Sequence, residues 1–315
     1  MQSSWWAEFR VDAGYAHFAT ILKDMTRIYG GAVVMKFSYS PTHCFYYIPD
    51  GPILPEDEEL GGEIFETILA DIEERRKTET HIVSHLRIEP RWSRLPAFVK
   101  GWRATPELTD CYREPRNTLY MDLRLSDDDL LAQMKPKGRY NIRVAQRHGV
   151  QVVEDNSRKG LADFLRLYKR MAERKDINAK PSGYFRTLAS TLFDVKRGSL
   201  YFAEYQGRRI AAAIVVHFGK QATYFFGGSD VTDRNVMAPY LLHFEIMRRA
   251  RAIGCEWYDF WGVGPQDQPD HPWHNFSVFK RKFGGVEISL VPTLDYVYDE
   301  AAYDQFMAAK GKIKT

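Results

Sequence analysis

Residues 202–216 read FAEYQGRRIAAAIVV, and this stretch decides the fold because an earlier part of the chain resembles it. Residues 18–34 read FATILKDMTRIYGGAVV, so both stretches contain two apolar runs separated by a polar turn. Such a pattern predicts a β-hairpin. An aromatic run that ends in glycine follows each hairpin, at residues 45–51 and 224–228. We therefore expect two copies of one α/β module.

The spacing of apolar residues predicts helices between these strands. Apolar residues recur at helical intervals in four segments: residues 60–72, 161–171, 185–192 and 240–247. Ser126 and Ser182 are expected to be N-caps, and Gly254 is expected to follow a helix C-terminus. The sequence thus predicts an α/β (α+β) protein in which each module is a mixed central sheet flanked by helices.

Composition and charge exclude several classes of protein. The chain has 315 residues, of which 44% are hydrophobic, and this excludes an intrinsically disordered or collagen-like chain. The formal net charge is only +3, so contact with a nucleic acid requires a local basic patch. Apolar runs fall far short of the roughly 20 residues that span a bilayer, and we expect no membrane span.

Cysteine and histidine usage predicts neither disulfides nor a metal site. Cys44, Cys111 and Cys255 are widely spaced, and no basic segment followed by an apolar one opens the sequence, so we expect a cytoplasmic protein. His271 and His274 lack the cysteines or carboxylates that would complete a metal site. The GxGxxG, Walker A, HExxH and GxSxG motifs do not occur, and we expect no cofactor.

The strongest local charge feature lies at residues 135–148, which contain basic residues but no acidic one. Arg139, Arg143 and Arg147 recur every four residues, so a helix would present them as one basic stripe. A solvated helix surface and a phosphate-binding surface both fit this stripe.

A lysine lies among aromatic residues at residues 276–285, which read FSVFKRKFGG. A lysine held against aromatic walls could stabilise an oxyanion. A helix that simply ends in basic residues is the alternative interpretation of this pattern.

An ordered series of short motifs resembles the FemABX family. The motifs are WAEF at residues 6–9, YIPDGP at 47–52, LRIEP at 86–90, RYNIR at 139–143, YDFWG at 258–262 and FKRKFGG at 279–285. They run in order over nearly the whole chain. Members of this family are non-ribosomal peptidyltransferases that move an amino acid from aminoacyl-tRNA to an amine of a peptidoglycan precursor.

The resemblance implies two GNAT-like domains, which agrees with the repeated hairpins. Some members carry a long helical hairpin, and this chain is similar to the compact FemX-like type without that insertion. We expect residues 1–117 together with residues 286–315 to form the first domain, and residues 118–285 to form the second.

The resemblance also implies candidate site residues. Lys280, after Phe279, matches the family lysine thought to stabilise the oxyanion that forms when the amine attacks the ester carbonyl. Arg10 takes the place of a basic residue that holds the nucleotide diphosphate of the acceptor in FemX-like enzymes.

Three further residues correspond to the acceptor site of FemX-like enzymes. Lys180 and Tyr184 match a second basic and aromatic pair, and Phe226 falls where a tyrosine can occur. Arg10 and Lys180 keep their charge but exchange arginine and lysine character, which alters phosphate recognition. Phe226 lacks the hydroxyl group. These departures leave the acceptor open between a UDP-linked muropeptide, a lipid-linked muropeptide and a small amine.

The sequence therefore predicts an aminoacyltransferase with aminoacyl-tRNA as donor and a nucleotide-linked or peptide amine as acceptor, preferably of the UDP-MurNAc-pentapeptide type. Arg139, Arg143 and Arg147 would contact the tRNA. An acyl-CoA-dependent GNAT-type N-acyltransferase is an alternative, although residues 227–230 are only a poor candidate for its glycine-rich phosphate turn. A tRNA- or nucleotide-binding protein without catalytic activity is the non-enzymatic alternative.

Overall fold

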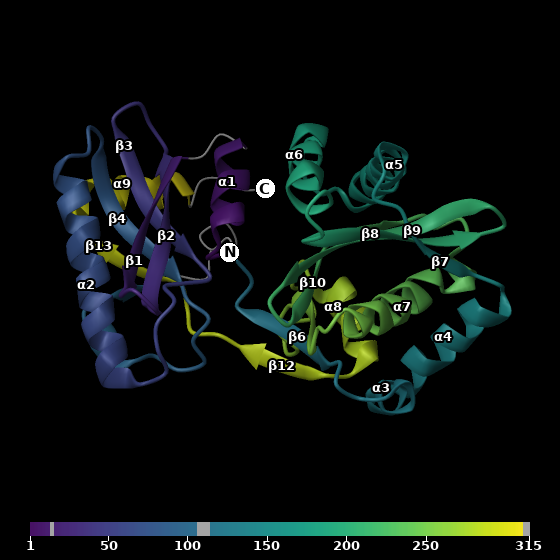
Figure 1. Ribbon diagram of the computed structural model, residues 1–315. Helices are drawn as coiled ribbons and strands as arrows, with labels where there is room; N and C mark the ends of the chain where they lie inside the picture. Colours follow the sequence, from purple (N-terminus) through teal and green to yellow (C-terminus); the bar gives the residue numbers. More distant parts are fainter. Residues whose placement is uncertain (13–15, 106–113, 311–315) are drawn as a thin grey trace. The chain divides into compact units, whose positions relative to one another are not determined.

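The computed structural model describes residues 1–12, 16–105 and 114–310 (Figure 1). The chain forms two compact units. Unit 1 comprises Met1–Arg116 with Ser289–Thr315, and unit 2 comprises Asn117–Ile288. Each unit contains one mixed sheet with flanking helices, which confirms the predicted fold class. Cys111 lies outside the described residues.

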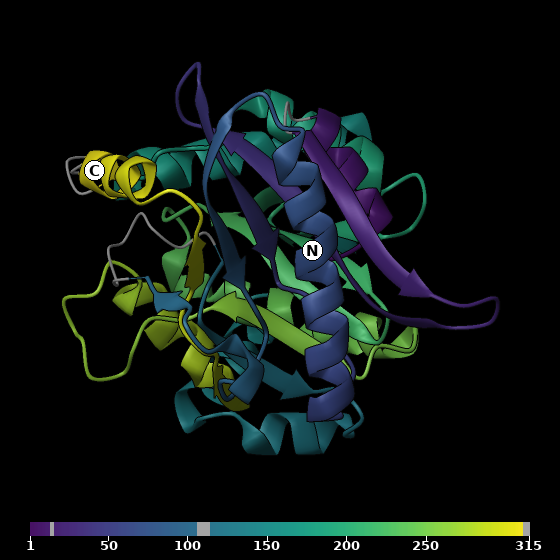
Figure 2. The same ribbon diagram turned by 90° about the vertical axis from the view of Figure 1, so that its left-hand side faces the viewer.

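Unit 1 is built on a six-stranded sheet with the order β1-β2-β3-β4-β13-β5. Its strands are β1 (Ala16–Lys23), β2 (Ile28–Ser38), β3 (His43–Pro49), β4 (Ile82–Glu89), β5 (Arg103–Ala104) and β13 (Leu294–Val297). Its helices are α1 (Ser4–Asp12), α2 (Glu58–Lys77), η1 (Ala97–Val99) and α9 (Glu300–Lys310). The parallel neighbours β3 and β4 are joined through α2, which lies along one face of the sheet (Figure 2).

Helix α2 forms because its apolar residues recur at helical spacing and its N-terminus is capped. The Asp57 carboxylate accepts a hydrogen bond from the backbone N–H of Leu60 at 2.9 Å. Ile64, Ile68 and Ile72 are buried against the sheet. Burial of each such side chain contributes about 1.5–3 kcal/mol, so this stripe anchors the helix.

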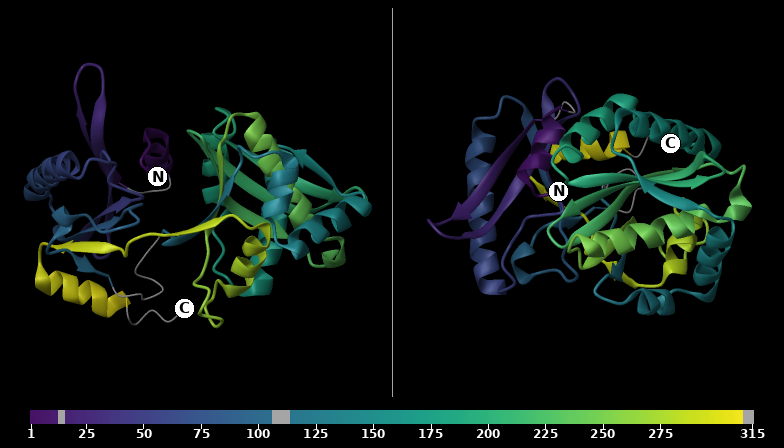
Figure 3. Two further views of the ribbon diagram at one scale, coloured as in Figure 1. Left: turned by 90° about the horizontal axis from the view of Figure 1, so that it is seen from below. Right: turned by 45° about the vertical axis from the view of Figure 1, so that its right-hand side comes forward.

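Unit 2 is built on a seven-stranded sheet with the order β12-β6-β11-β10-β9-β8-β7. Its strands are β6 (Asn117–Asp122), β7 (Gln151–Glu154), β8 (Gly198–Tyr205), β9 (Arg208–Phe218), β10 (Gln221–Ser229), β11 (Trp257–Gly262) and β12 (Val286–Ser289). Its helices are α3 (Asp127–Gln133), α4 (Pro136–Arg147), α5 (Arg158–Lys175), α6 (Ser182–Leu192), η2 (Arg234–Val236), α7 (Ala238–Ala252), α8 (His274–Lys280) and η3 (Arg281–Phe283). Helices α5 and α6 lie on one face of the sheet, and α7 lies on the other (Figure 3).

The predicted hairpins are both present. Strands β1 and β2 pair antiparallel, as do β8 and β9. Each hairpin continues into a third antiparallel strand, β3 in unit 1 and β10 in unit 2. The repeated sequence pattern thus corresponds to one three-stranded meander in each unit.

Two of the three predicted helix ends are confirmed. Ser126 caps α3 by accepting the backbone N–H of Asp129 at 3.2 Å, and Gly254 follows α7 with a φ of 91°. The prediction for Ser182 is wrong, because the extended Pro181 occupies the N-cap position and Ser182 is the first residue of α6. The Ser182 hydroxyl instead accepts a hydrogen bond from Arg186 at 3.1 Å.

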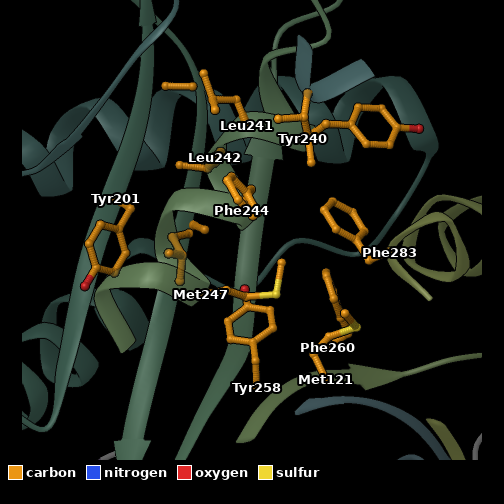
Figure 4. Packing of buried hydrophobic residues seen from close by; sticks show 14 of the residues in the cluster. Met121, Tyr201, Tyr240, Leu241, Leu242, Phe244, Met247, Tyr258, Phe260 and Phe283 are labelled. Carbon is orange, nitrogen blue, oxygen red and sulfur yellow. The ribbon is translucent and has the colours of Figure 1, made fainter. Parts of the chain in front are cut away.

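The core of unit 2 fills the space between the sheet and α7 (Figure 4). Phe244 and Met247 of α7 meet Tyr258 and Phe260 of β11 in this core. The ring centroids of Phe260 and Phe283 are 4.8 Å apart, so the segment after α8 is anchored to the same core.

Across residues 1–12, 16–105 and 114–310, no helix combines the length and the apolar character that a membrane crossing requires.

Candidate functional site

The parallel strands β10 and β11 pair over only a short distance. The ladder joins residues 221–223 to residues 257–259 and then ends. The register of β10 against β9 shifts between Tyr224 and Phe226, and that of β11 against β6 shifts before Gly262. Such irregularities bend a strand and free backbone groups for other partners. One of these groups, the carbonyl oxygen of Gly262, accepts a hydrogen bond from Lys280.

The Lys280 amine is buried beside this irregular segment. Lys280 is the last residue of α8 and is only 7% exposed. Its Nζ lies 2.7 Å from the carbonyl oxygen of Gly262 and 4.9 Å from the ring centroid of Phe276. Burial lowers the pKa of Lys280 to about 7, although the nearby Asp259 favours the charged form. The amine therefore changes its protonation state close to neutral pH.

Tyr224 forms a second aromatic wall of this site. Its ring centroid lies 5.7 Å from the Lys280 Nζ, and burial raises the pKa of Tyr224 to about 12, so its hydroxyl stays protonated. The hydroxyl fits against Gly227, where a Cβ atom would lie only 2.0 Å from the Tyr224 Oη. Gly227 is therefore required by this close approach.

His243 of α7 supports the same wall from behind. Its ring centroid lies 4.5 Å from that of Tyr224, and its Nδ1 lies 2.8 Å from the hydroxyl oxygen of Tyr258. Burial lowers the pKa of His243 to about 3, and the charge of Lys280 acts in the same direction. The imidazole is therefore neutral at physiological pH and is a weak base.

Phe279 faces α7. Its ring centroid lies 4.9 Å from that of Tyr240 and 5.6 Å from that of His243. Phe276 and Tyr224 are the rings beside the Lys280 amine. The sequence pattern placed Phe276 among the aromatic residues around this lysine, but it did not predict Tyr224. The spacing of four residues between Phe276 and Lys280 indicates that the two side chains are neighbours, because residues four apart share one face of a helix.

The structure brings Lys180, Tyr184 and Phe226 together in unit 2. The Nζ of Lys180 lies 5.7 Å from the ring centroid of Tyr184, which lies 5.9 Å from that of Phe226. Phe226 also packs against Phe185 of α6 at 4.9 Å. Strand β10 thus carries residues of both clusters, with Tyr224 beside Lys280 and Phe226 beside Tyr184.

Arg10 lies in unit 1, in the last turn of α1. This helix is held by the buried side chains of Trp6 and Phe9. Burial and the nearby carboxylates, including that of Asp50, raise the pKa of Glu114, whereas the charge of Arg10 lowers it. The charge of Arg10 therefore acts on the carboxyl group of Glu114 in unit 1.

The predicted basic stripe divides into two parts in the structure. Arg139 donates hydrogen bonds to the carbonyl oxygens of Ala132, at 3.3 Å, and Met134. Its guanidinium group therefore satisfies carbonyl groups at the end of α3. Arg143 and Arg147 are exposed.

Two further residues of α4 accompany the exposed arginines. The Lys137 Nζ lies 5.0 Å from the ring centroid of Tyr140, and the Arg147 guanidinium carbon lies 5.9 Å from it. Tyr140 is itself half exposed. Lys137, Tyr140, Arg143 and Arg147 form a surface that we call the α4 cationic face.

The described part of the chain contains no group of three or more His, Cys, Asp or Glu side chains placed to hold a metal ion. His271 has a structural contact, because its Nδ1 accepts the backbone N–H of Trp273 at 3.0 Å.

A separate surface groove of about 670 Å³ lies in unit 2 between the N-terminal half of α5 and the C-terminal half of α6. Leu161, Leu165 and Phe193 supply apolar lining, and Arg158 and Arg186 supply positive charge. This groove does not include Lys280 or the cluster around Tyr184.

Comparison with other proteins identifies the class to which this fold belongs. The family model described as an acetyltransferase (GNAT) domain matches residues 135–273. A solved structure described as FemX is similar with a TM-score of 0.86, covering 96% of this chain and 93% of that chain at 18% identity. The C-terminal domain of a putative lysylphosphatidylglycerol synthetase from Agrobacterium fabrum is similar with a TM-score of 0.61 at 14% identity, covering 98% and 92% of the two chains. The protein therefore has the GNAT-type fold of FemX.

Two curated proteins are also similar to this chain in sequence. A UDP-N-acetylmuramoylpentapeptide-lysine N(6)-alanyltransferase from Weissella viridescens is 26% identical, covering 62% of this chain and 57% of that protein. A lipid II:glycine glycyltransferase from Staphylococcus epidermidis is 21% identical, covering 62% of each chain. The match thus spans about three fifths of the length of these curated relatives. These relatives and the FemX-like fold agree with the resemblance to the FemABX family that the sequence motifs carry.

Proposed function

We propose that this protein is an aminoacyltransferase that joins an amino acid to an amine of a peptidoglycan precursor. The buried Lys280 amine beside the irregular segments of β10 and β11 carries the proposal. The names of the relatives support the class of acceptor, because one acts on a UDP-N-acetylmuramoyl pentapeptide lysine and another on lipid II.

Aminoacyl-tRNA is the proposed donor. The neutral acceptor amine attacks the ester carbonyl carbon, a carbon–nitrogen bond forms, and the bond to the ribose oxygen breaks. The amine loses one proton and the departing ribose oxygen gains one. The ester is already activated, so positioning and charge stabilisation can carry most of the rate without a covalent enzyme intermediate.

Lys280 is the group that we propose for charge stabilisation. Its ammonium form donates a hydrogen bond to the oxygen of the tetrahedral intermediate, on which negative charge develops. Exclusion of water strengthens that interaction, because screening by solvent is weak in a buried site. Phe276 and Tyr224 supply the aromatic surfaces that exclude water around the amine.

The cluster of Lys180, Tyr184 and Phe226 is the proposed acceptor site. Lys180 is exposed and can meet the diphosphate of a nucleotide-linked acceptor, and Tyr184 beside it offers a ring surface. Phe226 gives this cluster an apolar ring at a position where a tyrosine would offer a hydroxyl group. Within unit 1, we separately propose Arg10 as a phosphate contact.

The α4 cationic face is the proposed contact for the tRNA backbone. Lys137, Arg143 and Arg147 are exposed on α4 and lie in a segment without acidic residues. Such uncompensated cations bind phosphate groups through salt-sensitive contacts. Arg139 is left out of this surface because it bonds to the end of α3.

The surroundings of α7 disfavour the acyl-CoA alternative. A CoA pyrophosphate needs backbone N–H groups at a helix N-terminus, but Pro239 removes one such group from the first turn of α7. Asp230 and Asp233 precede this helix and add negative charge, although each pairs with an arginine. Gly227 and Gly228 belong to strand β10, not to a helix N-terminus. Gly227 lies against Tyr224, and Gly228 lies against the backbone of α5.

The proposal is tested by transfer of label from bulk tRNA charged with labelled amino acids to UDP-MurNAc-pentapeptide and, in parallel, to lipid II. RNase treatment and the Lys280→Ala variant are the controls. Product that requires intact RNA and Lys280 supports the proposal and identifies the amino acid. Failure of the protein either to bind or to discharge charged tRNA contradicts it, and transfer from acetyl-CoA in its place favours the alternative.

A further inference from the structure

Asp259 is a buried acid in the middle of an aromatic strand. It lies between Tyr258 and Phe260 in β11 and has no measurable exposure. Its carboxylate accepts hydrogen bonds from the Thr118 hydroxyl of β6 and from the Gln221 side-chain amide of β10, the latter at 3.2 Å. A charge buried in this way is costly unless a specific partner compensates it.

The same carboxylate shapes the backbone that Lys280 contacts. Asp259 accepts a hydrogen bond from the backbone N–H of Trp261 at 2.8 Å. The backbone φ angle of Trp261 is 61°, a value that residues other than glycine rarely adopt. This left-handed residue makes the backbone turn sharply near the end of β11, and we call this feature the Trp261 turn. It directly precedes Gly262, whose carbonyl oxygen accepts the hydrogen bond from Lys280. Asp259 therefore holds the turn that presents this carbonyl group.

Asp259 also supplies the charge that favours the ammonium form of Lys280. In the described part of the chain, the titratable groups around the amine are Asp259 from β11, His243 from α7 and Tyr224 from β10. His243 and Tyr224 are neutral near pH 7, since burial lowers the pKa of the first and raises that of the second. The negative charge of Asp259 opposes the effect of burial on the pKa of Lys280.

We propose that Asp259 is a positioning residue for Lys280, because its carboxylate holds the Trp261 turn and places a negative charge near the buried amine. This inference rests on the proposed role of Lys280 and deepens it. An amide could still accept the hydrogen bond from Trp261, so the negative charge is needed for Lys280 rather than for the turn. Asp259→Asn therefore separates the two roles.

The test measures the titration of Lys280 directly by NMR in protein labelled with ¹³C-lysine. The Lys280 signal is assigned by its loss in Lys280→Met. In Asp259→Asn we expect the Lys280 titration midpoint to fall by about 1 pH unit or more, as for removal of an opposite charge at close range. The matched control is Asp122→Asn, which removes a partly exposed acid from the neighbouring strand β6, where it pairs with Arg124. Its Lys280 titration should equal that of the wild type.

An unchanged Lys280 titration in Asp259→Asn would overturn the proposal. The measurement uses no substrate, so it stays informative even if the protein fails to transfer amino acids. Such a failure would contradict the proposed function alone.

Thermal unfolding of a double-mutant cycle covers the case in which Asp259→Asn folds poorly. The cycle compares Lys280→Met, Asp259→Asn and the double variant. If Asp259 serves Lys280, the gain in Tm from Lys280→Met should be larger in the Asp259→Asn background than in the wild type, because in that background the buried ammonium has lost its counter-charge. An equal gain in both backgrounds would contradict the pairing.

Discussion

Lys280 combines burial with an amine that titrates near neutral pH. Water surrounds most lysine side chains and keeps them protonated, whereas the walls formed by Phe276 and Tyr224 remove that solvation here. The hydrogen bond to the carbonyl oxygen of Gly262 orients the amine and leaves further N–H groups for a substrate oxygen. The chemistry of this residue therefore depends on its surroundings.

Replacement of Lys280 by methionine should reduce kcat by about 10²–10³-fold with little change in KM. The reason is that a buried donor to an oxyanion acts mainly in the transition state. Steady-state transfer assays with charged tRNA measure this effect. Lys282→Met is the matched control, because the Lys282 amine lies 5.9 Å from the Tyr240 ring centroid, whereas the Lys280 amine lies beside Tyr224 and Phe276. Equal losses in both variants would contradict the role of Lys280.

The same substitution should stabilise the folded protein at neutral pH. The pKa of Lys280 falls from an ordinary 10.5 to about 7, so the folded state binds fewer protons than the unfolded chain between these values. The resulting penalty is on the order of a few kcal/mol below pH 7 and disappears as pH rises toward 10.5. Lys280→Met should therefore raise Tm at pH 7, and its advantage should shrink at pH 9–10. A Tm difference independent of pH would argue against the lowered pKa.

Gly227→Ala should displace Tyr224, because the added Cβ would meet the tyrosine hydroxyl at 2.0 Å. We expect a loss of about 1–3 kcal/mol of stability and a fall in transfer activity. Gly183→Ala is the control for stability, since the nearest atom to its Cβ is 3.9 Å away in the flexible Arg186 side chain. Urea unfolding measures the free energy of unfolding of both variants. Equal values would show that the Tyr224 ring can move at little cost.

At the scale of elements, α4 separates structural from exposed arginines. Arg139 bonds to the end of α3, whereas Arg143 and Arg147 lie on the α4 cationic face beside Tyr140. The helix itself is explained by its buried residues, such as Ile142 and Ala145, together with Pro136 at its first position. Exposed cations on a helix that is already anchored in this way are free to serve a partner.

Replacement of Arg143 and Arg147 together by glutamine should weaken binding of charged tRNA without changing KM for the acceptor. The slope of log Kd against log salt should fall by about 2, because each arginine is expected to neutralise one phosphate group. The control is Arg166→Gln, since Arg166 is an exposed arginine of α5 that pairs with Asp163. Filter binding at several salt concentrations measures the slope, and an unchanged slope would remove the α4 cationic face from the RNA site.

At the scale of the whole molecule, the chain returns to unit 1 after completing unit 2. Strand β13 lies between β4 and β5, so residues far apart in sequence share one sheet. Arg87 and Asp295 form a buried ion pair across this junction at 2.7 Å, and Tyr303 of α9 donates a hydrogen bond to Asp295. Strand β13 and helix α9 therefore contribute to the unit 1 core.

Asp295→Asn should destabilise unit 1 by about 3–5 kcal/mol, because it removes the buried carboxylate charge that pairs with the guanidinium of Arg87. Burial alone would raise the pKa of Asp295, but Arg87 holds this pKa below its ordinary value of 3.8. The stability that the ion pair contributes is therefore present above pH 3.8 and is lost as the pH falls through the lowered pKa. Asp304→Asn on the exposed side of α9 is the control. Urea unfolding measures the loss, and equal stability of the two variants would contradict it.

Local sequence patterns determined the meanders, most helices and the resemblance to the FemABX family. Hairpins such as β8–β9 follow from two apolar runs around a polar turn, and the Ser126 cap follows from contacts within four residues. Ser182 was predicted wrongly because the extended Pro181 took the cap position. These are interactions between near neighbours in the chain, and a sequence displays them directly.

Only the tertiary structure decided the surroundings of Lys280 and the role of Arg139. Tyr224, Asp259 and Lys280 come from β10, β11 and α8, and no local pattern states that they share one buried site. The pKa of Lys280 depends on removal of water by such distant residues, and the Trp261 turn depends on a carboxylate held by other strands. Desolvation and long-range hydrogen bonding arise only when the chain has folded, and they are what lower the pKa of this lysine.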